Sequence, residues 1–172
     1  VIDTYPKKIR FAKNVEIINI IKKSVELREK IKNKEYRLCR IHGDFHPGNV
    51  IFKNKKIFEV LDASRELYGD PADDLTSMAI NYIWFALMHK GNFSGPFKEL
   101  FKIFWNNYLK KTKDTEINKI SPIFFAFRGL VVAHPLFYKN QNDKIRRKIF
   151  NFINNILEQG NFNYKKINSY IK

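Results

Sequence analysis

The chain has 172 residues, enough for one domain (residues 1–172) with a sizeable core, and 44% of them are hydrophobic. This composition excludes an intrinsically disordered chain. The formal net charge is +15, but the lysines are scattered without a dense basic arm, so a nucleic-acid partner is not expected. No stretch reaches the roughly 18 apolar residues of a membrane span, and we expect a soluble protein.

Two further features concern the ends and the compartment. The first residue is Val and not Met, so we expect a fragment of a longer protein or a processed product. The single cysteine, Cys39, cannot form an internal disulfide, which fits a cytoplasmic, reducing location. We predict a buried structural thiol there.

The chain begins with a predicted amphipathic helix over residues 15–34. Ile17, Ile21 and Val25 recur at four-residue steps between Lys and Glu, and Asn14 is a candidate N-cap.

A polar loop and a hairpin follow between residues 38 and 62. The mostly apolar run 38–41 predicts a strand and leads into a polar loop that contains Asp44 and Asn49. The apolar runs 50–52 and 57–61 predict a hairpin that ends on Asp62. The side chains of Asp44, Asn49 and Asp62 should therefore converge. Because a hydrophobic core has no need of carboxylates, this cluster indicates a functional site.

The rest of the chain predicts helices. A helix over residues 72–88 is apolar nearly all round, so it should be the buried central helix, ended by Gly91. Another begins at Pro96 after Ser94-Gly95 and carries an aromatic stripe that predicts core packing. We further predict a short helix from Asp114 to Ile120, a restart at Ser121-Pro122, and a last long helix over 143–159. The predicted fold is mainly α with a small β-hairpin (α+β).

The spacing of Asp44, Asn49 and Asp62 suits phosphoryl transfer. One carboxylate must orient a substrate hydroxyl and accept its proton. An amide oxygen and a second carboxylate can hold Mg²⁺, which prefers hard oxygen ligands.

The segment His42-Gly43-Asp44 to Asn49 resembles the catalytic loop of the aminoglycoside phosphotransferase and choline kinase-like family, and residues 69–75, Gly-Asp-Pro-Ala-Asp-Asp-Leu, resemble a second motif of that family. The resemblance implies a protein kinase-like fold, a nucleotide (ATP or GTP) as phosphoryl donor, and Mg²⁺ as cofactor. It implies Asp44 as the catalytic base and Asn49 and Asp62 as metal ligands. His42 would shape the loop.

Two more residues have open roles. Asp74 should cap the central helix and could hydrogen-bond the catalytic loop. Arg65 departs from the family's pattern after the metal-binding Asp; it could contact phosphate, or pair with Glu66, Asp70 or Asp73.

The resemblance covers the carboxy-terminal lobe of such an enzyme. A kinase clasps its nucleotide with a glycine-rich loop and a Lys on a neighbouring strand, but Gly43 is the first glycine of this chain. We therefore expect the N-terminal nucleotide-clasping lobe to be absent, and the exposed hairpin to favour self-association or binding of that lobe.

Two functions remain open at this point. One is a small-molecule kinase that acts on a substrate hydroxyl, of which this chain is the catalytic lobe; we expect this lobe to be inactive when isolated. The other is a non-catalytic binding module derived from the same fold. The strong positive charge disfavours polycationic aminoglycosides, and the substrate stays undefined.

Overall fold

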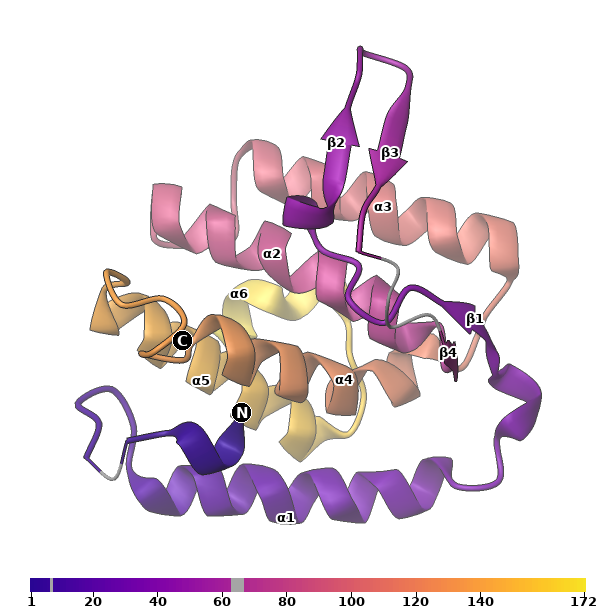
Figure 1. Cartoon of the computed structure of the whole chain (residues 1–172). Helices are drawn as coiled ribbons and strands as arrows, with labels where there is room; N and C mark the ends of the chain where they lie inside the picture. Colours follow the sequence, from indigo (N-terminus) through magenta and orange to yellow (C-terminus); the bar gives the residue numbers. More distant parts are fainter. Residues whose placement is uncertain (7, 63–66) are drawn as a thin grey trace.

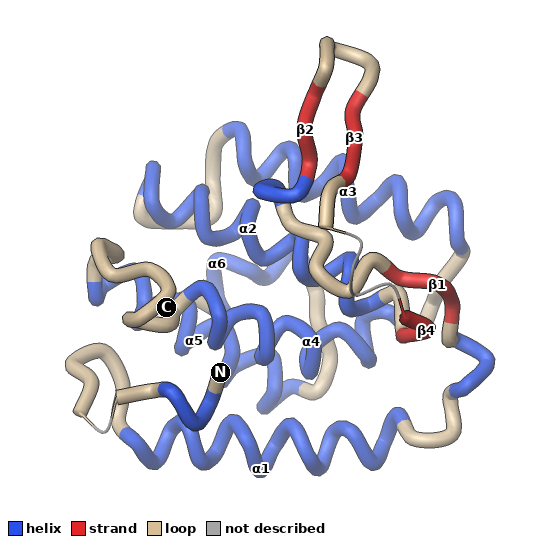
Figure 2. The backbone as a smooth tube through the Cα atoms, viewed as in Figure 1, coloured by secondary structure: helices blue, strands red, loops and turns tan. Residues whose placement is uncertain are grey.

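The computed structural model describes residues 1–6, 8–62 and 67–172. Helices dominate this structure, and two small antiparallel sheets lie at one end (Figures 1 and 2). The predicted α+β class, mainly helical, is confirmed. The helices are α1 (Asn14–Ile31), α2 (Ala72–Lys90), α3 (Pro96–Thr112), α4 (Ile117–Val132), α5 (Asp143–Gln159) and the short α6 (Ile167–Tyr170). Short 3-10 turns are η1 (Ile2–Thr4), η2 (Glu35–Arg37), η3 (Pro47–Asn49) and η5 (Tyr164–Lys166).

The strands form two separate pairs. β2 (Val50–Phe52) and β3 (Phe58–Val60) make the predicted hairpin, with Val50 opposite Val60. β1 (Cys39–Ile41) pairs with β4 (Leu67–Gly69), a strand that the sequence did not predict. Figure 1 shows the β2–β3 hairpin projecting from the helical body, with α1 along the opposite side.

Helix α2 is the buried centre of the molecule, as predicted, and packs against α3 and α4. Gly91 ends it with φ +69°, a left-handed conformation that glycine adopts without a Cβ clash. Behind it lies an aromatic cluster whose ring centroids are 4.6 to 6.3 Å apart. Its members are Phe101, Trp105, Phe125, Phe152, Phe162 and Tyr170. The aromatic stripe of α3 therefore contributes to the core, although Leu100 on the same helix is 45% exposed.

The predicted break between two helices at Ser121-Pro122 is wrong, because α4 runs through it. Pro122 has no N–H to bond the carbonyl of Asn118, one turn earlier. That carbonyl instead accepts a hydrogen bond of 2.7 Å from the N–H of Phe162. A distant segment thus satisfies the acceptor that proline leaves open.

Other local predictions need correction. Helix α1 begins at Asn14 itself, after Lys13, whose N–H donates to Glu16 at 2.8 Å. Val25 is exposed, although its spacing predicted a core position. Cys39 is also exposed, because β1 lies at the surface in a two-stranded sheet with β4. His134, just after the end of α4, is fully buried against Tyr5 and Phe137.

Candidate active site

The backbone of the loop after β1 is bound by the carboxylate of Asp74. Asp74, in the first turn of α2, accepts the N–H of His42 at 2.7 Å with Oδ2 and the N–H of Gly43 at 2.9 Å with Oδ1. Gly43 has φ +79°, a left-handed conformation that a side chain would disfavour. The loop therefore turns sharply over the amino-terminal end of α2, and Asp44 follows directly.

His42 connects this loop to the end of the hairpin. Its Nε2 donates to the carbonyl oxygen of Leu61 at 2.7 Å, and its Nδ1 accepts the N–H of Asp44 at 3.3 Å. These two partners assign the Nε2–H tautomer. The imidazole thus fixes the loop relative to Leu61, the residue before Asp62.

Asn49 lies between Asp44 and the same hairpin end. Its Nδ2 donates to the carbonyl oxygen of Asp44 at 3.0 Å, and its own carbonyl accepts the N–H of Leu61 at 2.8 Å. The bond commits the amide nitrogen, so Oδ1 is the Asn49 atom that can serve as a metal ligand. Asp62, at the exit of the hairpin, has φ +58°, a left-handed backbone that is uncommon outside glycine.

Arg128 of α4 reaches this loop, and the sequence analysis did not assign it. Its Nη1 donates to Asp44 Oδ1 at 3.0 Å, and its Nη2 donates to the carbonyl oxygen of Gly43 at 2.9 Å. Nε and Nη2 both donate to Asp73 Oδ1, at 3.1 and 2.7 Å. The available signal was a lone cation in the otherwise apolar stretch 123–133, because a buried guanidinium needs carboxylate partners.

Asp73 was named only as a possible partner of Arg65. Burial raises the pKa of the Asp73 carboxyl above its ordinary value, and the neighbouring Arg128 opposes that shift. Adjacent residues of α2 therefore have different contacts: Asp74 binds the loop backbone and Asp73 binds Arg128. Arg65 itself lies outside the described residues.

The described part of the chain contains no group of three or more His, Cys, Asp or Glu arranged to hold a metal. Two ligands from one amide and one carboxylate, Asn49 and Asp62, are few, but Mg²⁺ is commonly bound by one or two carboxylates together with substrate phosphates and water. The donor set therefore fits a Mg²⁺ ion that arrives with a nucleotide. It does not fit a closed structural metal site.

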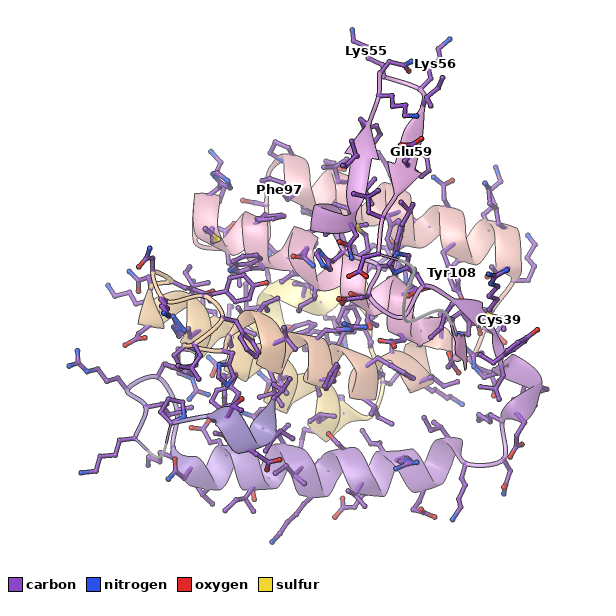
Figure 3. All side chains as sticks on the ribbon, in the orientation of Figure 1. Cys39, Lys55, Lys56, Glu59, Phe97 and Tyr108 are labelled. Carbon is purple, nitrogen blue, oxygen red and sulfur yellow. The ribbon has the colours of Figure 1, made fainter. Side chains whose placement is uncertain are left out.

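A cleft of about 730 Å³ lies beside the loop, between β1, α2 and α3. His42 and Phe45, which flank the Gly43–Asp44 pair, form its end at the loop. Figure 3 shows Cys39 and Tyr108 on this side of the molecule, with Lys55 and Lys56 at the tip of the hairpin. Most of the cleft wall is apolar and comes from Ile41, Val60, Leu75, Tyr82, Leu100, Ile103 and Phe104.

Part of the chain is similar to known proteins. Residues 10–90 match the model of a phosphotransferase enzyme family. The predicted resemblance is thus confirmed over the stretch that contains α1, the loop, both sheets and α2.

Two curated relatives are similar over a shorter span. Acyl-CoA dehydrogenase family member 11 from Rattus norvegicus and its counterpart from Mus musculus are each 26% identical over 85 residues. The alignment covers 48% of this chain and only 11% of either relative. No solved structure matches the chain. Within the described residues, no helix is long and apolar enough to cross a membrane.

Proposed function

We propose that this chain is the catalytic, carboxy-terminal lobe of a protein kinase-like phosphotransferase. It would transfer the γ-phosphoryl group of ATP or GTP to a hydroxyl group of a small molecule. The observation that carries the proposal is the bond from Asn49 Nδ2 to the Asp44 carbonyl, together with the bond from Leu61 to Asn49. These contacts bring the base, the amide oxygen and the hairpin exit at Asp62 around one loop.

The residues have distinct roles in this proposal. Asp44 orients the hydroxyl and accepts its proton as the oxygen attacks the γ-phosphorus. Asn49 Oδ1 and the Asp62 carboxylate would hold Mg²⁺. When bound, the ion neutralises charge on the nucleotide phosphates. His42 and Asp74 keep the loop in place through the bonds described above.

The nucleotide clasp would come from an amino-terminal lobe outside these residues, because no glycine precedes Gly43. The β2–β3 hairpin offers that lobe a surface, since its large apolar side chains are exposed. These are Ile51, Phe52, Ile57, Phe58 and Val60. The same surface would support self-association of the isolated chain. A single cysteine fits a cytoplasmic, reducing location.

The experiment is Asp44→Asn in the full-length protein, assayed with ATP and GTP against a panel of small hydroxyl compounds. We expect transfer to fall by about 10²- to 10⁴-fold, the usual contribution of a general base, with the fold retained. Asp3→Asn, which changes an exposed carboxylate of η1, is the matched control. Normal turnover by the Asp44 variant would refute its role as the base, and no transfer by the wild-type protein to any acceptor would favour the alternative, a non-catalytic binding module.

A further inference from the structure

Arg128 is a buried cation that contacts two carboxylates at the candidate site, Asp44 and Asp73. The residue is 7% exposed and lies on α4, which packs against α2. Removing a guanidinium from water is unfavourable unless charge and hydrogen bonds compensate it. Asp44, Asp73 and the Gly43 carbonyl provide that compensation at 2.7 to 3.1 Å.

Resting on the proposed function, we infer that Arg128 is a positioning residue for Asp44 and that Asp73 is the permanent counter-ion that lets it act so. Arg128 holds Asp44 through Oδ1. This contact restricts rotation of the carboxylate and so fixes the direction from which a substrate hydroxyl would deliver its proton.

Gly43 shows that the loop is fixed from two helices at once. Its N–H donates to Asp74 of α2, and its carbonyl accepts from Arg128 of α4. Both polar backbone atoms of the residue before Asp44 are therefore anchored. The Arg128 guanidinium contacts both the Gly43 carbonyl and the Asp44 carboxylate. It therefore fixes the position of Asp44 and the orientation of its side chain together.

Charge balance explains why Asp73 is needed. With both carboxylates ionised, the set of Asp44, Asp73 and Arg128 carries one net negative charge. During transfer the substrate O–H bond breaks and its proton goes to Asp44. The oxygen's electron pair forms the bond to the γ-phosphorus, and the bond from that phosphorus to the β-phosphate oxygen breaks, releasing the nucleoside diphosphate. Arg128 then keeps Asp73 as a counter-ion, so protonation of Asp44 never leaves a buried guanidinium uncompensated.

The test compares Arg128→Gln, Arg128→Lys and Asp73→Asn in the full-length protein. The assay measures turnover of Mg·ATP and Mg·GTP, with water as acceptor and with any acceptor that the hydroxyl panel selects. We expect Arg128→Gln to lower kcat by about 10²-fold, the effect of misplacing a reacting group by about 1 Å, with the nucleotide KM within about threefold. Arg128→Lys keeps the charge and should recover part of kcat. Asp73→Asn should lower kcat, and the double variant should be no worse than Arg128→Gln, because the two residues act as one unit.

Arg146 supplies the matched control. It is a buried arginine at 2% exposure whose guanidinium donates to the carbonyls of Ala133 and Tyr138. Arg146→Gln should lower the melting temperature as Arg128→Gln does, while kcat of the folded fraction stays near that of the unchanged protein. If Arg128→Gln does not fold, Arg128→Lys and Asp73→Asn decide: both at wild-type kcat would overturn the inference.

The outcomes separate the two proposals. No transfer by the wild-type protein would remove the proposed function itself, and full activity of Asp44→Asn would remove Asp44 as the base that Arg128 positions. An inactive Asp44→Asn beside an Arg128→Gln variant with kcat within about threefold of wild type would refute the positioning role alone.

Discussion

Arg37 and Asp114 face each other through two parallel hydrogen bonds of 2.7 and 2.8 Å. The same guanidinium donates to Asp70 at 2.7 and 3.1 Å, and Tyr108 donates to Asp114 at 2.7 Å. Asp70 in turn accepts the N–H of Ala72, the first residue of α2. One arginine, whose side chain is 6% exposed, therefore joins η2, the loop before α4 and the beginning of the helix that holds the loop at residues 42–44.

This arrangement predicts a pH-dependent contribution of Asp114 to stability. Burial alone would raise the pKa of Asp114, but the hydrogen bonds from Arg37 and Tyr108 outweigh it and lower the pKa below the ordinary 3.8. A carboxyl with a lowered pKa stabilises the fold at higher pH, and that contribution is lost as the pH falls below about 4 and the group is protonated. Asp114→Asn should thus lower the unfolding free energy by about 1–3 kcal/mol at pH 7. Urea unfolding at pH 7 and pH 3 would show the difference from wild type shrinking in acid; an equal difference at both would contradict the prediction.

Substitution of Asp74 should affect the loop at residues 42–44 and not only the helix on which Asp74 lies. Asp74→Asn replaces one acceptor oxygen by an NH₂ group, so the N–H of either His42 or Gly43 loses its partner. A lost partner for a part-buried N–H costs about 1–3 kcal/mol, and the loop should become mobile. Hydrogen exchange should accelerate at residues 42–44. Asp143→Asn, at the exposed beginning of α5, is the control and should leave that exchange unchanged.

Magnesium binding should depend on nucleotide. On the proposal that Asn49 and Asp62 are the protein ligands, we expect Mg²⁺ alone to bind weakly, with a dissociation constant above about 1 mM, since phosphates would complete its shell. Calorimetry with and without a non-hydrolysable nucleotide tests this on the full-length protein. Asp62→Asn should raise the Mg²⁺ concentration needed for half-maximal turnover. A nucleotide–Mg²⁺ structure with both side chains away from the ion would refute the assignment.

The exposed hairpin predicts the behaviour of the isolated 172-residue chain. It should fold and show little transfer, but associate with itself through the apolar side chains of β2 and β3. Phe52 and Phe58, 66% and 53% exposed with ring centroids 5.8 Å apart, are the natural targets. Phe52→Lys with Phe58→Lys should shift the light-scattering mass toward the monomer. Association that persists unchanged in this variant would place the contact elsewhere.

Gly129 should resist substitution because α4 and α5 approach closely there. A Cβ at this position would lie 2.8 Å from Cδ1 and Cγ1 of the buried Ile153. Overpacking outweighs the better helix propensity of alanine, so Gly129→Ala should lower the unfolding free energy by about 1–2 kcal/mol. Adding Ile153→Val removes Cδ1 and should recover part of the loss in denaturant unfolding. A stabilised Gly129→Ala protein would show that the helices can move apart at little cost.

The sequence by itself determined the features that depend on local chemistry, such as motifs, helix patterns and helix ends. The spacing of Asp44, Asn49 and Asp62 and the motif at 69–75 indicated the site. The apolar pattern of residues 72–88 predicted the central helix, and the predicted helix over 143–159 is α5, where Asn142 accepts the N–H of Lys144 and Gly160 takes φ +59°. These features depend on neighbours within a few residues, which the sequence displays directly.

Only the tertiary structure decided which distant groups meet. Arg128 is 84 positions from Asp44, and no periodicity relates a cation on one helix to a carboxylate in a loop. The continuity of α4 through Pro122 depends on the N–H of Phe162, a residue beyond the end of α5, which bonds the carbonyl that proline leaves without a donor. The exposure of Cys39 likewise follows from which strands pair, and strands as short as β1 and β4 carry too few residues to specify their partner. Contacts between residues that are distant in the sequence depend on packing and charge compensation in the folded chain. Neither can be read from the sequence alone.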